Sequence, residues 1–199
     1  MLLKPSSIIS KVYQPIAGKE ADDKKPPVFL TEDGAAFSFV DQQGLALTKA
    51  IGDLEQGKTT HYYSYGNFNL VRLMLHIIKQ TGPVHAFMTS YSFSQKSIEQ
   101  IQRQKELQNL LSFKVIIDNR VRSLSPKPFQ MLMKSFDYRC SSINAKVALL
   151  WNDKWNISIV TSQNATDNPK LERGTIFTDK SVFDFDLNAL QNEYDRGNL

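Results

Sequence analysis

Strand-like apolar segments alternate with amphipathic helical segments through the middle of this 199-residue chain. Residues 67–82 have the apolar period of a helix, and residues 83–93 form a nearly continuous apolar run. Residues 94–111 are helical in pattern again, and residues 113–119 are a second apolar run. Helices that alternate with buried strands are typical of α/β domains. The alternation therefore predicts an α/β fold.

A hydrophobic hairpin in the second half of the chain makes the predicted sheet mixed. Residues 144–151 and 155–161 are strand-like and enclose the polar turn Asn152-Asp153-Lys154. The strands of a hairpin are antiparallel, whereas strands joined through helices are parallel. The remaining pattern predicts a helix, a strand, a further strand and a polar helix, at residues 126–136, 138–143, 174–179 and 184–196. We expect a mixed, mostly central β-sheet flanked by helices on both faces.

The first part of the chain differs from the rest. Residues 1–30 include the charged, proline-ended run GKEADDKKPP, which predicts an N-terminal arm or linker. Residues 31–199 are then the α/β domain. At its start we expect a hairpin around Asp33-Gly34, a helix over residues 45–56 and a strand over residues 60–66.

Composition excludes several classes of protein. The net charge of +4 permits an anionic partner without requiring one, because the charges are spread along the chain. A single cysteine, Cys140, excludes an internal disulfide framework and a cysteine-built metal site. No apolar stretch approaches the roughly 20 residues that a membrane span needs. We therefore predict a cytoplasmic protein without a membrane span, a metal or a cofactor.

Polar side chains follow three of the expected strands. These segments are Ser90-Tyr91-Ser92, Asp118-Asn119-Arg120 and Ser162-Gln163-Asn164. Ligands of α/β proteins gather where strands end. A lysine, Lys146, also lies inside the first hairpin strand, and burying a lysine is costly unless it meets an anion. The pattern indicates either a sheet-edge lysine or a site for an anion.

Residues 45–180 resemble the phospholipase D superfamily. Its signature is His-x-Lys, four residues and Asp, followed by a hairpin into Gly-Ser-x-Asn. Here NAKVALLW stands at the first motif, so Lys146 matches the lysine, while Asn144 and Trp151 replace the histidine and the aspartate. TSQN matches the second motif at Ser162 and Asn164.

Two further segments add to the resemblance. NPKLERG resembles the downstream segment that carries a glutamate in this family, which gives Glu172 that place. HAFMTSYSFS is similar to the early strand of the family, which ends in a Tyr-Ser-Phe-like run.

The resemblance implies a phosphate site with a degenerate motif. In this family the histidine attacks a phosphodiester and forms a phosphohistidine, while the lysine and the asparagine hold phosphate oxygens. The implied phosphate ligands are Lys146, Ser162, Asn164 and Glu172, with Arg120 at the mouth of the site. An asparagine amide cannot act as the nucleophile, so we expect phosphodiester binding without cleavage.

Simpler readings of the same residues stay open. Lys146 would then be a snorkelling edge lysine, and Ser162 and Asn164 would serve turns. Glu172 would be a solvated loop residue that pairs with Arg173 or Lys170. We also expect Trp151 and Trp155 to form a cross-strand aromatic pair.

Three functions follow from the sequence. The first is a catalytically degenerate phospholipase D-like domain that binds DNA or RNA; short single-motif members of the family pair two chains, which implies a homodimer. The second is an active nuclease with a non-standard nucleophile or base such as His61, since His76 and His85 are expected to be packed. The third is a non-catalytic structural or interaction protein.

Overall fold

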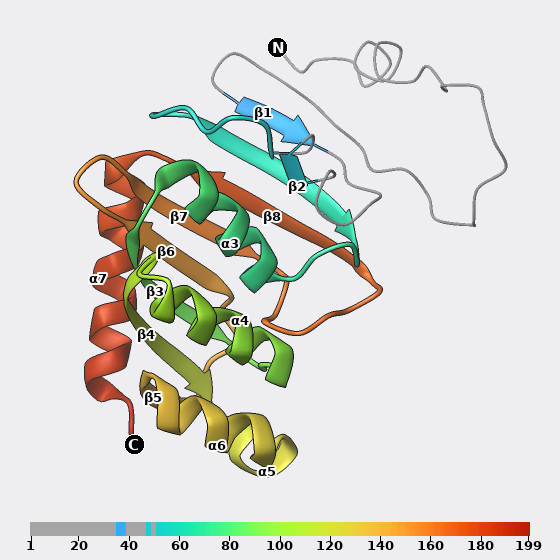
Figure 1. The fold of residues 1–199 in the computed structure, drawn as a ribbon, viewed down its shortest axis with the longest axis vertical. Coiled ribbons are helices and arrows are strands. Elements are labelled where there is room, and N and C mark those ends of the chain that lie inside the picture. The colour runs from blue at the N-terminus through green and yellow to red at the C-terminus, as the bar shows by residue number, and fades with distance from the viewer. Residues whose placement is uncertain (1–34, 39–46, 49–50) are drawn as a thin grey trace, which may run out of the picture.

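The computed structural model describes residues 35–38, 47–48 and 51–199. These residues form an eight-stranded sheet with helices on both faces, in the strand order β1-β2-β8-β7-β6-β3-β4-β5 (Figure 1). The strands are β1 (Ala35–Ser38), β2 (Thr59–Tyr65), β3 (Val84–Ser90), β4 (Leu110–Asp118), β5 (Asp137–Ser141), β6 (Val147–Trp151), β7 (Asn156–Thr161) and β8 (Leu171–Phe177). The helices are α3 (Leu70–Thr81), α4 (Gln95–Glu106), α5 (Val121–Leu124), α6 (Pro126–Ser135) and α7 (Lys180–Arg196).

The predicted mixed α/β sheet is confirmed. Strands β3, β4 and β5 are parallel and are connected through α4 and through α5 with α6. Strand β6 joins them antiparallel to β3, and β7 and β8 continue the antiparallel half. The ends of β3, β4 and β7 therefore lie beside the beginnings of β6 and β8, along the border of the sheet that is formed by strand ends and not by an outermost strand. We call it the polar edge.

Two apolar clusters hold the layers together. The larger cluster lies between the sheet and the helices α3, α4 and α6, which Figure 1 shows in front of the sheet. The smaller cluster joins Phe87, Ile116 and Leu149 to Phe183 and Leu190 of α7 on the other face. Side chains alternate along each strand, so neighbouring residues belong to different clusters. This alternation decides which polar side chains can meet at the polar edge.

Helix α3 shows why one predicted boundary was wrong. The helical pattern begins at Asn67, and both Asn67 and Asn69 are of a residue type that caps helices. The structure uses Asn69, whose side chain accepts a hydrogen bond of 3.0 Å from the Arg72 main-chain N–H. Asn67 still belongs to the turn after β2, where its main-chain N–H donates to Ser64 Oγ at 3.3 Å. Gly82, the last residue of the predicted range, is the C-cap of the helix and has a φ of 76°.

Other boundaries also differ from the predictions. Strand β8 begins at Leu171, three residues before the predicted start, so Glu172 lies in the sheet. The helix expected over residues 45–56 does not extend past Ile51, because Gly52 has a φ of 63° and the chain then turns. Strand β1 pairs parallel with β2. The hairpin turn at residues 33–34 and the arm at residues 1–30 lie outside the described residues.

The two tryptophans of the hairpin do not form the expected pair. Trp151 is opposite Asn156 in the register of β6 and β7, so Trp155 lies one position beyond the pairing. Trp151 packs with the cluster beneath α7, whereas Trp155 packs with the cluster beneath α3 and α4. None of the helices among the described residues combines the length and hydropathy of a membrane span.

Candidate functional site

Lys146 lies at the polar edge, immediately before β6. Its main-chain oxygen accepts a hydrogen bond of 3.0 Å from Thr161 N, which extends the β6–β7 pairing by one residue. Thr89 at the end of β3 fixes the other side, since its hydroxyl donates to Ala145 O at 2.9 Å and accepts from Val147 N at 3.1 Å. The backbone that carries Lys146 is therefore held from both neighbouring strands.

The ammonium group of Lys146 is held by neutral oxygens. Its Nζ donates to both the main-chain oxygen and the side-chain Oδ1 of Asn144, each at 2.7 Å. Partial burial lowers the pKa of Lys146, and the negative charge of Glu172 opposes this by raising it. Among the described residues, no carboxylate forms an ion pair with this ammonium. Lys146 thus presents a partly desolvated positive charge whose direct partners are neutral.

Glu172 is a buried carboxylate beside Lys146. Its side chain follows the alternation of β8 toward the same face as Gly174 and Ile176, and it is 8% exposed. Oε1 accepts a hydrogen bond of 2.6 Å from Asn168 Nδ2, and Oε2 accepts one from the Ser162 hydroxyl. The reading of Glu172 as a solvated loop residue was wrong, because β8 begins before it and takes it into the sheet.

Ser162 and Asn164 follow β7 and join this cluster from the other side. Ser162 Oγ accepts from Arg173 N at 3.0 Å while it donates to Glu172. Asn164 Oδ1 accepts from Tyr91 N at 3.2 Å, which orients the amide group. Within the described part of the chain, Asn164 Nδ2 makes no hydrogen bond. Its two N–H groups are therefore available as donors.

The loop that carries Asn164 is fastened to the starts of two helices. Asn164 O accepts from Leu70 N at 3.2 Å, at the beginning of α3. Ala165 O accepts from Ser94 N at 3.1 Å at the N-cap of α4, and Ala165 N donates to Ser90 Oγ at 3.0 Å. These bonds use main-chain groups of the loop and hold it whatever side chain stands at position 164.

Tyr62 and Gln163 hold the loop that carries Ser162 and Asn164 through buried hydrogen bonds. No sequence pattern singles them out. The Tyr62 hydroxyl is 2.8 Å from Gln163 Oε1 and 3.0 Å from Thr161 Oγ1. Gln163 is 2% exposed, and its Nε2 donates to Phe68 O at 2.6 Å. Burial raises the pKa of Tyr62 above its usual range, and Glu172 adds to this. Gln163, the middle residue of Ser-x-Asn, is therefore a structural anchor.

Arg120 lies at the rim of the polar edge and is already paired. Its Nε donates to Asp118 Oδ1 at 2.7 Å and its Nη2 to Oδ2 at 3.3 Å. The Asp118 side chain is only 1% exposed, and it also accepts hydrogen bonds from the main chain of Arg120 and Ile143. These bonds hold the pKa of Asp118 below its usual range and raise that of Arg120.

The structure separates Trp151 from the other motif residues. Trp151 ends β6, so the length of the strand lies between it and Lys146. Its ring stacks on His85 at a centroid distance of 5.6 Å and packs against Phe183 at 5.8 Å. Trp151, at the aspartate position of the motif, therefore takes no part in the polar-edge cluster.

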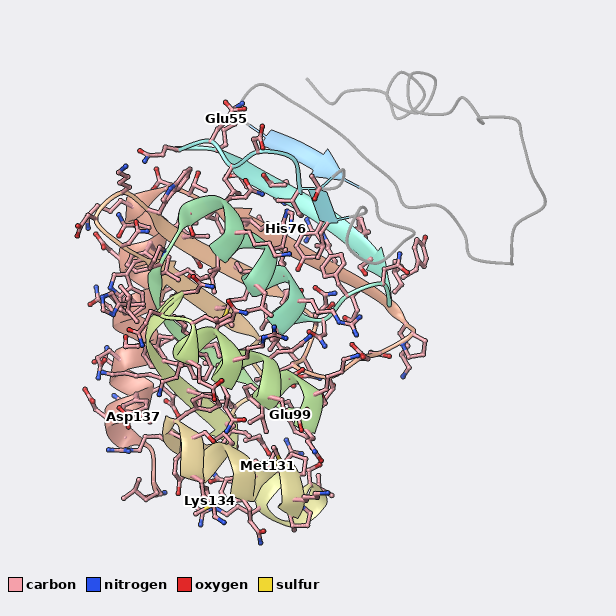
Figure 2. The ribbon with its side chains drawn as sticks, viewed as in Figure 1. Glu55, His76, Glu99, Met131, Lys134 and Asp137 are labelled. Atoms are coloured by element: carbon pink, nitrogen blue, oxygen red, sulfur yellow. The ribbon has the colours of Figure 1, made fainter. Side chains whose placement is uncertain are left out.

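The three histidines lie away from the polar-edge cluster. His85 stacks on Trp151, as described above. His61 lies on the α7 side of β2, because its neighbour Tyr62 belongs to the opposite cluster, and its Nδ1 is 2.9 Å from Thr175 Oγ1. His76 lies on α3 in the helical layer, 3.1 Å from Gln80 Nε2 (Figure 2). Among the described residues, no group of three or more His, Cys, Asp or Glu is arranged to hold a metal.

Two surface hollows lie at the sheet edge opposite Lys146. One of about 300 Å³ is lined by residues that include Gln56, Lys154 and Asp179. The other, of about 480 Å³, is lined by residues that include His85 and Trp151. They contain none of the motif residues that gather at the polar edge, so we place the candidate site at the polar edge and not in these hollows.

Comparison with known proteins identifies the fold. No protein-family model and no curated sequence matches the chain. Among solved structures, Nuc from Salmonella typhimurium, a phospholipase D family member, superimposes with a TM-score of 0.54 at 15% identity, covering 70% of this chain and 97% of that one. NucT from Helicobacter pylori gives a TM-score of 0.51 at 14% identity, covering 69% of this chain and 97% of that one.

A third structural neighbour is TrmBL2, an archaeal chromatin protein with a novel mode of DNA binding. Its TM-score is 0.51 at 7% identity, with 74% of this chain and 55% of that chain covered. At these identities the likeness concerns the fold. The predicted phospholipase D-like fold is confirmed.

Proposed function

We propose that this chain, built on the phospholipase D fold, binds a phosphodiester of nucleic acid at the polar edge and does not cleave it. The observation that carries the proposal is the Lys146 ammonium, which is partly buried and has only neutral oxygens as direct partners. A phosphate oxygen in place of Asn144 Oδ1 would give this cation a charge-assisted hydrogen bond.

Four of the five predicted ligands have a role in this proposal. Lys146 supplies the charge, and Asn164 Nδ2 supplies donors that are already oriented by Tyr91. Ser162 exchanges Glu172 for a phosphate oxygen as its hydrogen-bond acceptor. Glu172 is itself anionic, so we assign it the positioning of Ser162 and the stabilisation of charged Lys146.

The expected lack of cleavage rests on Asn144. Its amide is not a nucleophile toward phosphorus, and its Oδ1 is held by Lys146. His61, the proposed alternative, lies on the other face of the sheet from the Lys146 side chain. Metal-independent hydrolysis of bis-p-nitrophenyl phosphate that is lost in Lys146→Ala would overturn this part of the proposal and support the active-enzyme alternative.

Binding is tested by anisotropy titration of labelled duplex DNA at several salt concentrations. Each phosphate contact adds about 0.9 to the slope of log affinity against log salt. Lys146→Ala should weaken binding and reduce the slope by about that amount, and Lys146→Arg should retain most of it. Asn164→Ala should weaken binding with little change in slope, since it removes a neutral donor.

The matched control is Lys154→Ala, which makes the same charge change at the exposed turn of the hairpin, at the opposite edge of the sheet. It should leave affinity and slope close to wild type. If the wild type does not bind at low salt, or if Lys146→Ala binds as the wild type does, the site is silent and the chain is a structural or interaction protein.

We further propose that two copies of the chain pair through the polar edge. The support is that the chain carries a single copy of the motif, since single-motif members of this family form one site from two chains. A cytoplasmic location and a DNA or RNA partner remain predictions of the sequence.

A further inference from the structure

We infer that Tyr91 and Arg120 form a stacking platform for a nucleobase beside the phosphate site. The inference deepens the proposed function and rests on it: it adds that bases of single-stranded nucleic acid are contacted as well as phosphates. It also gives Arg120 a role other than the phosphate ligand that the sequence predicts.

The guanidinium group of Arg120 lies over the ring of Tyr91. The guanidinium carbon of Arg120 lies 4.7 Å from the centroid of the Tyr91 ring, the shortest cation–ring distance among the described residues. The Arg120 side chain is nevertheless 63% exposed. The guanidinium group therefore contacts the ring, while much of the side chain remains open to solvent. Bases stack on arginine planes and on aromatic rings in this way.

The pairing with Asp118 fixes the plane and reduces the free charge of Arg120. Two guanidinium nitrogens and the main-chain N–H of Arg120 bind the same buried carboxylate. A guanidinium neutralised by a carboxylate contributes less to phosphate binding than a free one, but its planar surface still stacks. The fixed orientation also lowers the entropy lost when a base binds.

The platform is contiguous with the phosphate site through two hydrogen bonds. Tyr91 N donates to Asn164 Oδ1 at 3.2 Å. Asp118 accepts from the main chain of Ile143, the residue before Asn144, which holds Lys146. A phosphate at Lys146 and Asn164 would thus have its own or an adjacent base beside Tyr91 and Arg120.

The test compares two single strands that differ only in their bases. One is a labelled mixed-sequence DNA strand of about ten nucleotides, within the usual span of such sites. The other is an abasic strand with the same length and number of phosphates. Base–aromatic stacking predicts that wild type binds the base-bearing strand on the order of tenfold more tightly. Lys146→Ala should weaken both strands by similar factors and keep the preference.

Variants of the platform should act on the preference alone. Arg120→Lys keeps the charge but loses the plane, so it should bind the two strands about equally, as should Tyr91→Leu. Tyr91→Phe keeps the ring and should keep the preference. Thermal melts identify any variant that fails to fold, and the Phe and Leu substitutions at position 91 remain as a test if Arg120 proves necessary for folding.

The outcomes separate the two proposals. Equal binding of both strands by wild type, or a full preference in Arg120→Lys and Tyr91→Leu, overturns the platform while the phosphate site stands. No binding of either strand at low salt overturns both.

Discussion

The ring of Tyr62 crosses β8 directly over Gly174, and no other residue type fits at that position without displacement. A Cβ at position 174 would lie 2.2 Å from Cζ and from the hydroxyl oxygen of Tyr62. The absence of a side chain lets the Tyr62 hydroxyl reach Thr161 and Gln163, beneath the loop that carries Ser162 and Asn164. Gly174, which is not among the candidate ligands, therefore helps to shape the candidate site.

Gly174→Ala should destabilise the domain by about 1–3 kcal/mol, the usual range for overpacking. The expected cause is the contact with Tyr62. Tyr62→Phe should not relieve it, because Cζ remains, whereas Tyr62→Leu should. Urea unfolding of the single and double variants measures the coupling. If Gly174→Ala costs as much in the Tyr62→Leu background as in the wild type, the clash is not the cause.

Asp118→Asn should lower stability by about 1–2 kcal/mol at neutral pH, because hydrogen bonds to a buried charge are lost. The pKa of Asp118 is depressed below its ordinary value of 3.8 in the folded protein. The unfolded chain therefore binds the proton more readily, so the contribution of Asp118 is present above about pH 4 and is lost as pH falls through the folded-state pKa.

The pH dependence distinguishes this carboxylate from the others. Thermal melts between pH 2 and 7 should show a smaller loss of stability toward acid in Asp118→Asn than in the wild type. Asp153→Asn, which changes an exposed carboxylate in the hairpin turn, is the control and should leave the profile unchanged. Parallel profiles for all three proteins would mean that Asp118 does not titrate as described.

Asn144→Ala should strengthen DNA binding by roughly two- to tenfold, the equivalent of one neutral hydrogen bond. The variant removes Oδ1, which accepts a hydrogen bond from the Lys146 ammonium and would compete with the proposed phosphate for it. Position 144 is exposed, so stability should change by less than about 0.5 kcal/mol. Ser142→Ala, an exposed neighbour, is the control. Weaker binding in Asn144→Ala would indicate that Asn144 is a ligand and not a competitor.

The chain should be a dimer in solution at tens of micromolar, with an interface that includes the polar edge. Leu171 begins β8 at this edge and is 53% exposed, so Leu171→Glu should shift light scattering toward the monomer mass. Leu111, at the opposite end of β4, is 48% exposed, and Leu111→Glu is the matched control. A monomeric wild type, or equal effects of the two variants, contradicts the proposed interface.

The fold was predictable because local periodicity determined most elements. The apolar face of α3 and the continuous apolar runs of β3 and β4 identify their own structures. Boundaries were less accurate where two residues could serve equally, as Asn67 and Asn69 did at the start of α3. The early beginning of β8 depends on pairing with β2, where Glu172 lies opposite Ser64, and such long-range pairing has no local sign.

The candidate site was predictable in part for the same reason. Lys146, Ser162 and Asn164 follow a motif order that can be read along the chain, and the structure brings them to one edge. The support from Tyr62 and Gln163 comes from side-chain directions across three strands, which only the assembled sheet defines. The Tyr91–Arg120 contact likewise joins the ends of two strands whose adjacency the chain order alone does not state.

The exposed position of Asn144 has a consequence for the evolution of such a domain. The backbone beneath Lys146 is held by Thr89 and by the β6–β7 pairing, and neither depends on the side chain at position 144. A lineage that exchanged a nucleophile there would keep its folding intact, and selection on stability would not oppose the change. A change of residue type at position 144 can therefore alter the chemistry available there without altering the fold, because the supports of Lys146 are part of the sheet.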